Sequence, residues 1–220
     1  MIRAIIYDFD GVICDSVHIK SEAFVELYTP FGDEIASAVK EYHLAHGGVS
    51  RFEKFRHWHK KYLGITLSDD EVMDLAKQFS VLVKQKVIAS SYISGAQEYL
   101  NKHQKNYHQF ICTGTPTNEI EEILNAKKIR SLFTDIFGSP QKKIEILQKI
   151  IDQYQLISSE MIYFGDSTTD LNAANHFDIA FIGINAVDID KDCIKYDTFL
   201  DISHIPVDEL YVNDVNQLRN

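Results

Sequence analysis

Short apolar segments that alternate with helical patterns are the feature that most restricts how this 220-residue chain can fold. Five segments rich in β-branched and aromatic residues recur at 4–7, 109–112, 133–137, 161–164 and 179–184. Short apolar strands separated by helices are typical of a parallel sheet with helices on both faces. We therefore predict an α/β fold with a Rossmann-like parallel sheet at its core.

One long interruption breaks this alternation after the first strand. From about Asp15 to Ser91 the chain shows helical periodicity and no convincing strand. Helices are expected over 21–28, 34–44, 52–62 and 69–86, and a capping-box pattern of Ser68 and Glu71 precedes the last one. We interpret residues 16–91 as an inserted helical-bundle cap domain, and residues 1–15 and 92–220 as the α/β core domain.

Composition narrows the class of protein. The formal net charge of −10 argues against a nucleic-acid binder, because phosphate backbones would be repelled.

No apolar run approaches the length of a membrane span, and the first residues lack a signal-peptide pattern. Three scattered cysteines without a C-x-x-C pair fit a reducing compartment, and we expect Cys14 to be a buried, unreactive thiol.

We therefore expect a cytoplasmic protein with neither a nucleic-acid nor a membrane partner. The aspartate-rich stretch after Asp188 is interpreted as a solvated closing segment. The sequence gives no indication of the oligomeric state.

Polar residues follow the first four apolar segments at the point where each strand should end. Active sites of parallel sheets lie at the carboxyl ends of the strands, so these residues should meet at one edge. Asp8 and Asp10 come first. Side chains two apart in an extended chain point to the same side, and two carboxylates that close require a cation or a shared proton.

The middle clusters offer groups that suit a phosphate. Thr113 and Gly114 supply a hydroxyl and accessible backbone N–H groups for phosphate oxygens. Either Lys142 or Lys143, after the turn 138–140, can neutralise the carboxylates and an incoming phosphate.

The last cluster adds two more carboxylates. Asp166 and Asp170 lie four residues apart, so that both face one side if a helix begins here; the alternative is that one of them is a helix cap. Four carboxylates at one sheet edge select a hard cation, and such sites for phosphate chemistry favour Mg²⁺.

In this order the motifs resemble those of the haloacid dehalogenase superfamily: D-x-D-G-V from Asp8, T-G at Thr113, a lysine, and G-D-S-x-x-D ending at Asp170. The resemblance is to its Mg²⁺-dependent phosphatases with a helical C1-type cap, of the phosphoglycolate phosphatase and β-phosphoglucomutase-like kind. It implies a phosphatase that hydrolyses a small phosphorylated metabolite, a phosphomonoester, through an aspartyl-phosphate intermediate.

The resemblance also implies roles for the four aspartates. Asp8 would be the nucleophile. Asp10 would protonate the leaving alcohol and then activate water, while its backbone carbonyl binds the metal. Asp8 and Asp166 would supply carboxylate ligands to Mg²⁺, and Asp170 would hold a metal-bound water or the lysine.

Thr113, the Gly114 backbone and a lysine would bind the transferring phosphoryl oxygens. We choose Lys143 because the family lysine commonly stands three residues after the proline of a Gly-Ser-Pro turn, here Pro140. Many members carry Lys-Pro at this point and this chain does not, so Lys142 remains an alternative.

In the predicted cap, the loop 46–51 resembles the specificity loop of β-phosphoglucomutase-like members. Arg51 is therefore the candidate for binding a distal anionic group of the substrate. The helix that follows carries a run of basic side chains, which we interpret as a solvated face.

Three other functions compete with the phosphatase. A phosphosugar mutase would use the same scaffold, and a non-catalytic binding protein would have little reason to keep the carboxylates. A phosphonate hydrolase would need a cap lysine as a Schiff-base former, such as Lys54, Lys60 or Lys61. We rank it low, below the mutase, because none of these lysines is expected in a desolvating context.

Overall fold

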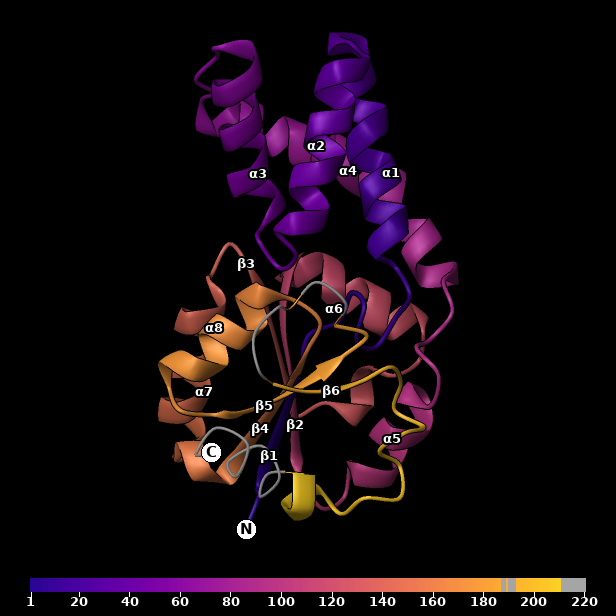
Figure 1. Cartoon of the computed structure of the whole chain (residues 1–220), viewed down its shortest axis with the longest axis vertical. Helices are drawn as coiled ribbons and strands as arrows, with labels where there is room; N and C mark the ends of the chain where they lie inside the picture. Colours follow the sequence, from indigo (N-terminus) through magenta and orange to yellow (C-terminus); the bar gives the residue numbers. More distant parts are fainter. Residues whose placement is uncertain (187–188, 190–192, 211–220) are drawn as a thin grey trace.

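The computed structural model describes residues 1–186, 189 and 193–210. Within that part, a parallel sheet has the strand order β3-β2-β1-β4-β5-β6 (Figure 1). The strands are β1 Ala4–Tyr7, β2 His108–Pro116, β3 Asp135–Ser139, β4 Met161–Gly165, β5 Ala180–Ile184 and β6 Ile194–Tyr196. The predicted α/β fold with a Rossmann-like sheet is confirmed.

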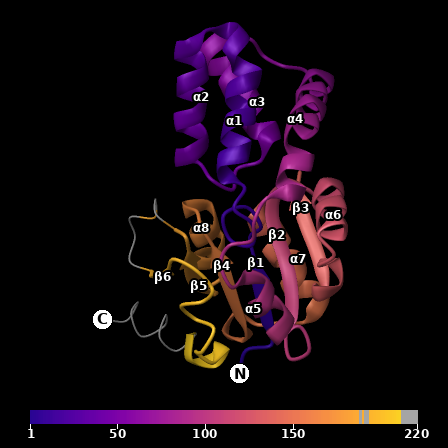
Figure 2. The same ribbon diagram turned by 90° about the vertical axis from the view of Figure 1, so that its right-hand side faces the viewer.

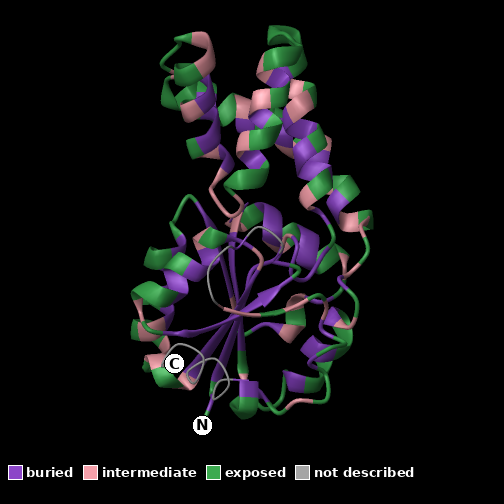
Figure 3. Ribbon diagram, viewed as in Figure 1, coloured by how far each residue is buried: buried purple, intermediate pink, exposed green. Residues whose placement is uncertain are grey.

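Helices cover both faces of the sheet. Apolar side chains of α5 Ala96–His103 and α6 Thr117–Ala126 pack in one core cluster, against the face that carries Ile5 and Tyr7. Those of α7 Lys143–Tyr154 and α8 Thr168–His176 pack against the other face. Every residue of β1, β4 and β5 is buried (Figure 3), as expected for parallel strands between two helical layers.

The register of the central strands determines where the polar motifs meet. Tyr7 of β1 is level with Ile111 of β2 and with Phe164 of β4. Because the three strands are parallel, the residues that follow these positions emerge at the same edge.

Four helices stand beyond that edge (Figures 1 and 2). They are α1 Val17–Tyr28, α2 Asp33–Ala45, α3 Arg51–Trp58, continued by a π-helical turn at His59–Leu63, and α4 Asp69–Ala89. Rings from three of them, including Phe24, Trp58 and Phe79, pack together. The predicted capping box of α4 is present, since the Glu71 N–H donates to Ser68 Oγ and the Ser68 N–H donates to the Glu71 carboxylate.

The two chain segments that join these helices to the sheet run side by side. The Asp15 N–H donates to the Ser91 carbonyl at 3.0 Å, and the Ile93 N–H donates to the Ile13 carbonyl at 2.9 Å. Cys14 lies between them and is buried as expected, and burial raises the pKa of its thiol to about 12.

Two sequence-based expectations need correction. The third strand begins at Asp135 and not at Phe133, because the chain first makes a 3-10 turn at Arg130–Leu132. The segment after Asp188 is not simply solvated: its described part adds β6 and buries Phe199, Ile202 and Leu210. These apolar residues are separated by polar ones, so that the composition concealed them. Residues 187–188, 190–192 and 211–220 of this region lie outside the described residues.

Among the described residues, no helix combines the length and apolar character needed to cross a membrane.

Candidate active site

Asp8 lies at the centre of the carboxyl edge, directly after β1, and is buried. One carboxylate oxygen, Oδ1, accepts the Phe9 N–H at 2.7 Å. The other, Oδ2, accepts from the Lys143 ammonium at 2.8 Å. Both contacts fix the orientation of the carboxylate.

The start of α7 brings Lys143 to this carboxylate. The Lys142 N–H donates to the Glu145 carboxylate at 3.0 Å, which caps the helix and leaves Lys143 as its first residue. The Lys143 side chain is buried between Asp8 and Asp170. The Lys142 side chain is 70% exposed, and its nearest carboxylate is Glu53 at 3.8 Å. Lys143, and not Lys142, is therefore in contact with the acidic residues.

Asp170 is fully buried and both of its carboxylate oxygens are occupied. One accepts from Lys143 and from the Tyr163 hydroxyl, the latter at 2.6 Å. The other accepts from the Ser167 hydroxyl at 2.5 Å and from the Ser167 N–H at 3.2 Å, and the Asp170 N–H donates to Ser167 Oγ, which completes the capping box of α8. Asp170 therefore has both of the roles that the sequence predicted: it caps a helix and it contacts the lysine.

Asp166 joins Asp8 and Asp170 in a cluster whose carboxylate oxygens lie within 4.8 Å of one another. Burial raises the pKa of the Asp8 carboxyl to about 6 despite the opposing charge of Lys143. Burial and the charges of Asp8 and Asp170 raise the pKa of Asp166 well above its usual value. The cluster thus carries more negative charge than Lys143 neutralises, and its oxygen-only donor set suits a hard cation.

Asp10 does not share this cluster, although the sequence predicted that it would crowd Asp8. The chain turns after β1, and the Asp10 carboxylate accepts from Lys20, from Ser16 at 2.6 Å and from Thr115 at 3.0 Å. Burial alone would raise the pKa of Asp10, but these three donors, Lys20 foremost, lower it.

Lys20 was not among the residues predicted from the sequence. The available signal was its spacing of four residues from Ser16, which places both residues on one side of the first turn of α1.

Thr113 is buried at the same edge, and Gly114 beside it allows the loop between α2 and α3 to approach. A Cβ at Gly114 would lie 2.8 Å from the Gly48 carbonyl oxygen, and a Cβ at Gly48 would lie 2.8 Å from Lys143 Nζ. The Thr169 hydroxyl donates to the Gly47 carbonyl at 2.6 Å. The loop therefore closes directly over the acidic cluster.

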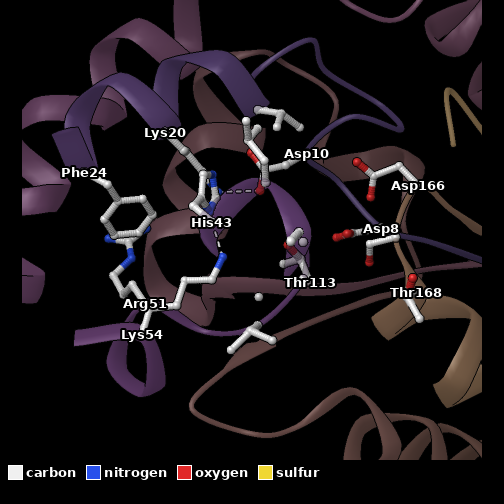
Figure 4. Close-up of a pocket in the computed structure, with 18 of the residues that line it drawn as sticks. Asp8, Asp10, Lys20, Phe24, His43, Arg51, Lys54, Thr113, Asp166 and Thr168 are labelled. Atoms are coloured by element: carbon white, nitrogen blue, oxygen red, sulfur yellow. Dashed lines mark hydrogen bonds and ion pairs between the residues drawn. The ribbon is translucent and has the colours of Figure 1, made fainter. Parts of the chain in front are cut away.

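A cavity of about 250 Å³ lies between the sheet edge and the four helices (Figure 4). Asp8, Asp10, Asp166, Thr113 and Gly114 line it from the sheet side. Loop residues 47–49 and side chains of α1 to α4 line it from the opposite side. A cavity of this size suits a small metabolite.

A family model for haloacid dehalogenase-like hydrolases matches residues 5–184. The chain belongs to this family. The resemblance drawn from the motifs is thereby confirmed, as is the class of enzyme, a hydrolase whose relatives include phosphatases.

Relatives and solved structures agree with this assignment. The chain is 24% identical over 189 residues to a phosphoglycolate phosphatase of Pasteurella multocida, covering 81% of this chain and 83% of the relative. A β-phosphoglucomutase from Clostridium difficile has a TM-score of 0.80 at 21% identity, covering 98% of this chain and all of that one. A predicted phosphoglycolate phosphatase from Haemophilus somnus has a TM-score of 0.72 at 20% identity, covering 93% and 97%. These structural likenesses show the fold.

On the side of the cavity formed by the four helices, Arg51 of the hydrolase lines the cavity but its guanidinium is already engaged. It donates to both carboxylate oxygens of Glu119 on α6, at 2.5 and 2.9 Å, and to the Ser80 hydroxyl at 2.7 Å. It also lies 4.5 Å from the centre of the Phe79 ring. The assignment of Arg51 to a substrate anion stays a prediction. Glu119 lies 68 residues from Arg51 in the chain and was not among the residues predicted from the sequence.

The basic helix of the hydrolase is not a uniform solvated face. Arg56, Lys60 and Lys61 are exposed, but Lys54 is only 2% exposed and lines the cavity. The expectation that no cap lysine is desolvated is therefore wrong. Lys54 lies next to Phe55 on the buried side of α3, and this position in the helical pattern was the signal for its burial.

Proposed function

We propose that this hydrolase is a Mg²⁺-dependent phosphatase that cleaves a small phosphomonoester through an aspartyl-phosphate on Asp8. The observation that carries the proposal is the buried Asp8 carboxylate, held by Lys143 at the floor of a small cavity beside Asp166. The phosphatase names of its curated relatives support it.

In the first step, a carboxylate oxygen of Asp8 attacks phosphorus, and the bond between phosphorus and the alcohol oxygen breaks. Asp10 donates a proton to the departing oxygen. Lys143, the Thr113 hydroxyl and the Gly114 N–H bind the phosphoryl oxygens, where negative charge must be stabilised.

In the second step, a water oxygen attacks the same phosphorus and the bond to Asp8 breaks. Asp10 accepts the proton of that water, which returns both carboxyl groups to their starting states. This second role requires an ionised Asp10, which the contacts with Lys20, Ser16 and Thr115 favour by lowering its pKa, whereas the first step uses its protonated form.

Asp8, Asp166 and the Asp10 backbone carbonyl would hold Mg²⁺. Asp8 and Asp166 fit the ion, because Lys143 is a single cation beside three clustered carboxylates, and the charges of Asp8 and Asp170 raise the pKa of Asp166. When bound, Mg²⁺ would neutralise charge on the phosphoryl oxygens. Asp170, whose oxygens are occupied by other donors, would hold Lys143 in position.

Residues 16–91 would form the cap domain over a core of residues 1–15 and 92–220. The two linking segments, Ile13–Asp15 and Ser91–Ile93, are hydrogen-bonded to each other, which supports these boundaries. A cap over the site would exclude water and large substrates, which favours a small phosphorylated substrate. A cytoplasmic location remains the expectation from the sequence.

Hydrolysis of p-nitrophenyl phosphate tests the metal requirement. We expect turnover with Mg²⁺, a decrease of at least about 100-fold after treatment with EDTA, and recovery when Mg²⁺ is added back. Full activity in EDTA would overturn the metal requirement. Inactivity with Mg²⁺ toward p-nitrophenyl phosphate and a panel of phosphorylated metabolites would overturn the phosphatase proposal.

The alternative, a phosphosugar mutase, is separated by its products. A mutase would interconvert isomers of a sugar phosphate in the presence of a bisphosphate and release inorganic phosphate only slowly. Stoichiometric release of inorganic phosphate without isomer formation is the result that we expect.

A further inference from the structure

The buried cations around the cavity are not all neutralised. Among the described residues, four lysine and arginine side chains are buried. Three of them are paired with carboxylates: Lys20 with Asp10, Arg51 with Glu119, and Lys143 with Asp8 and Asp170. The fourth, Lys54, has no carboxylate within ion-pair distance in the described part of the chain.

The polar contact of Lys54 is with another base. Its Nζ lies 2.7 Å from Nδ1 of His43 on α2, and His43 is also buried. Burial and the charge of Lys20 lower the pKa of Lys54 to about 7, and burial and Lys54 lower the pKa of His43 well below its usual value. Two neighbouring bases without an acid form a site whose charged state an anion would stabilise.

This pair lies on the cap side of the cavity and faces the proposed phosphate site. Figure 4 shows the Lys54 and His43 side chains on one side of the cavity, with Thr113 and Asp8 on the other. Apolar side chains, among them Val17, Phe24 and Leu44, also line the space. Such a cavity suits a short carbon chain with an anionic group at each end.

We propose that Lys54, supported by His43, binds a second anionic group of the substrate, and that the enzyme selects phosphomonoesters carrying a terminal carboxylate or second phosphate. This inference rests on the proposed phosphatase activity. It moves the recognition of the distal anion from Arg51, whose guanidinium is held by Glu119 and Ser80, to the buried cation that lacks an acidic partner.

Matched pairs of substrates test the proposal on the wild-type enzyme. Ethyl, propyl and butyl phosphate are compared with phosphoglycolate, 3-phosphonooxypropanoate and 4-phosphonooxybutanoate, and with 1,2-ethanediol and 1,3-propanediol bisphosphate. A charge-assisted contact in a buried site predicts a kcat/KM higher by about 10- to 100-fold for at least one charged substrate over its neutral partner. Equal kcat/KM across every pair would overturn the inference while leaving the phosphatase proposal intact.

The variant Lys54→Met then assigns the effect. We expect the ratio between charged and neutral substrates to fall to about one, mainly through KM of the charged substrate. Lys60→Met, on the exposed turn after α3, is the control and should keep the wild-type ratio. Because both substrates are measured on the same preparation of each variant, the ratio does not depend on how much of that variant is folded.

Two outcomes would assign the distal group differently. The ratio of kcat/KM between charged and neutral substrates could fall to about one in the double variant Arg51→Met/Glu119→Met and stay at the wild-type value in Lys54→Met. That result would assign the binding of the distal anion to Arg51. Covalent trapping of Lys54 by borohydride with phosphonoacetaldehyde, seen as a mass increase on the Lys54 peptide, would show an imine-forming amine. Either outcome overturns the proposal.

Discussion

Asp8→Asn is expected to abolish turnover of p-nitrophenyl phosphate, with kcat lower by at least about 10⁴-fold. The amide has nearly the size of the carboxylate but is a very poor nucleophile toward phosphorus. The amide carbonyl can accept from one of the two donors, Lys143 or the Phe9 N–H, whereas the NH₂ group, itself a donor, loses the contact with the other. The measurement is steady-state release of p-nitrophenolate with saturating Mg²⁺.

Folding of this variant is checked separately by thermal unfolding in EDTA. Burial raises the pKa of the Asp8 carboxyl to about 6, which means that its charged form is costly in the folded chain without metal. The neutral amide should therefore not lower the melting temperature greatly. A variant that folds and keeps more than a tenth of wild-type kcat would contradict the nucleophilic role of Asp8.

Asp10→Asn is the matched control, because it changes the second carboxylate by the same atoms. p-Nitrophenolate departs without a proton, so the first step should proceed in this variant, whereas the second step lacks its base. We expect a burst of about one p-nitrophenolate per chain followed by slow turnover. The absence of a burst, with full steady-state activity, would remove Asp10 from the mechanism.

The core part of the site was predictable because short-range rules and sheet geometry determine it. A parallel sheet places all carboxyl ends at one edge, and the register of Tyr7 with Ile111 and Phe164 is what these rules require. Asp8, Thr113 and the cluster after β4 therefore meet without any need to know the side-chain packing.

The side of the site formed by α1 to α4 was less predictable, because it depends on how these helices pack against each other and against the sheet edge. Lys20 reaches Thr115, which lies 95 residues away, and Arg51 reaches Glu119. No local pattern predicts such pairs. The sequence-based choice of Arg51 for a distal anion rested on its loop alone and could include neither the pairing of Arg51 with Glu119 nor, in the described part of the chain, the lack of an acidic partner for Lys54.

Lys143→Met is expected to reduce both activity and stability, because this one cation holds two buried carboxylates. Removal of one partner from a buried ion pair costs about 3–5 kcal/mol of unfolding free energy. Loss of a group that stabilises the transferring phosphoryl oxygens should also lower kcat by about 10³-fold. Urea unfolding in EDTA at pH 7.5 and p-nitrophenyl phosphate hydrolysis with Mg²⁺ measure the two effects.

The pH dependence gives this prediction a definite sign. Although burial opposes its charge, Asp170 and Asp8 raise the pKa of Lys143 above the usual value for lysine. A cation with a raised pKa stabilises the fold fully below the unfolded pKa, about 10.5, and its contribution is lost only as the pH rises beyond that. The difference in unfolding free energy that is due to the lysine charge should therefore persist between pH 7 and pH 9.

Lys142→Met is the control that separates the loss of the contact with Asp8 and Asp170 from the effect of replacing a lysine by methionine. It makes the same replacement one position earlier, on a side chain that is 70% exposed, so its unfolding free energy should change by less than about 0.5 kcal/mol. Its kcat should stay close to that of the wild type. If Lys142→Met were inactive and Lys143→Met active, the assignment of Lys143 as the lysine of this site would be wrong. We expect the opposite, because Lys143 is the lysine that contacts Asp8 and can stabilise the negative charge of the transferring phosphoryl group.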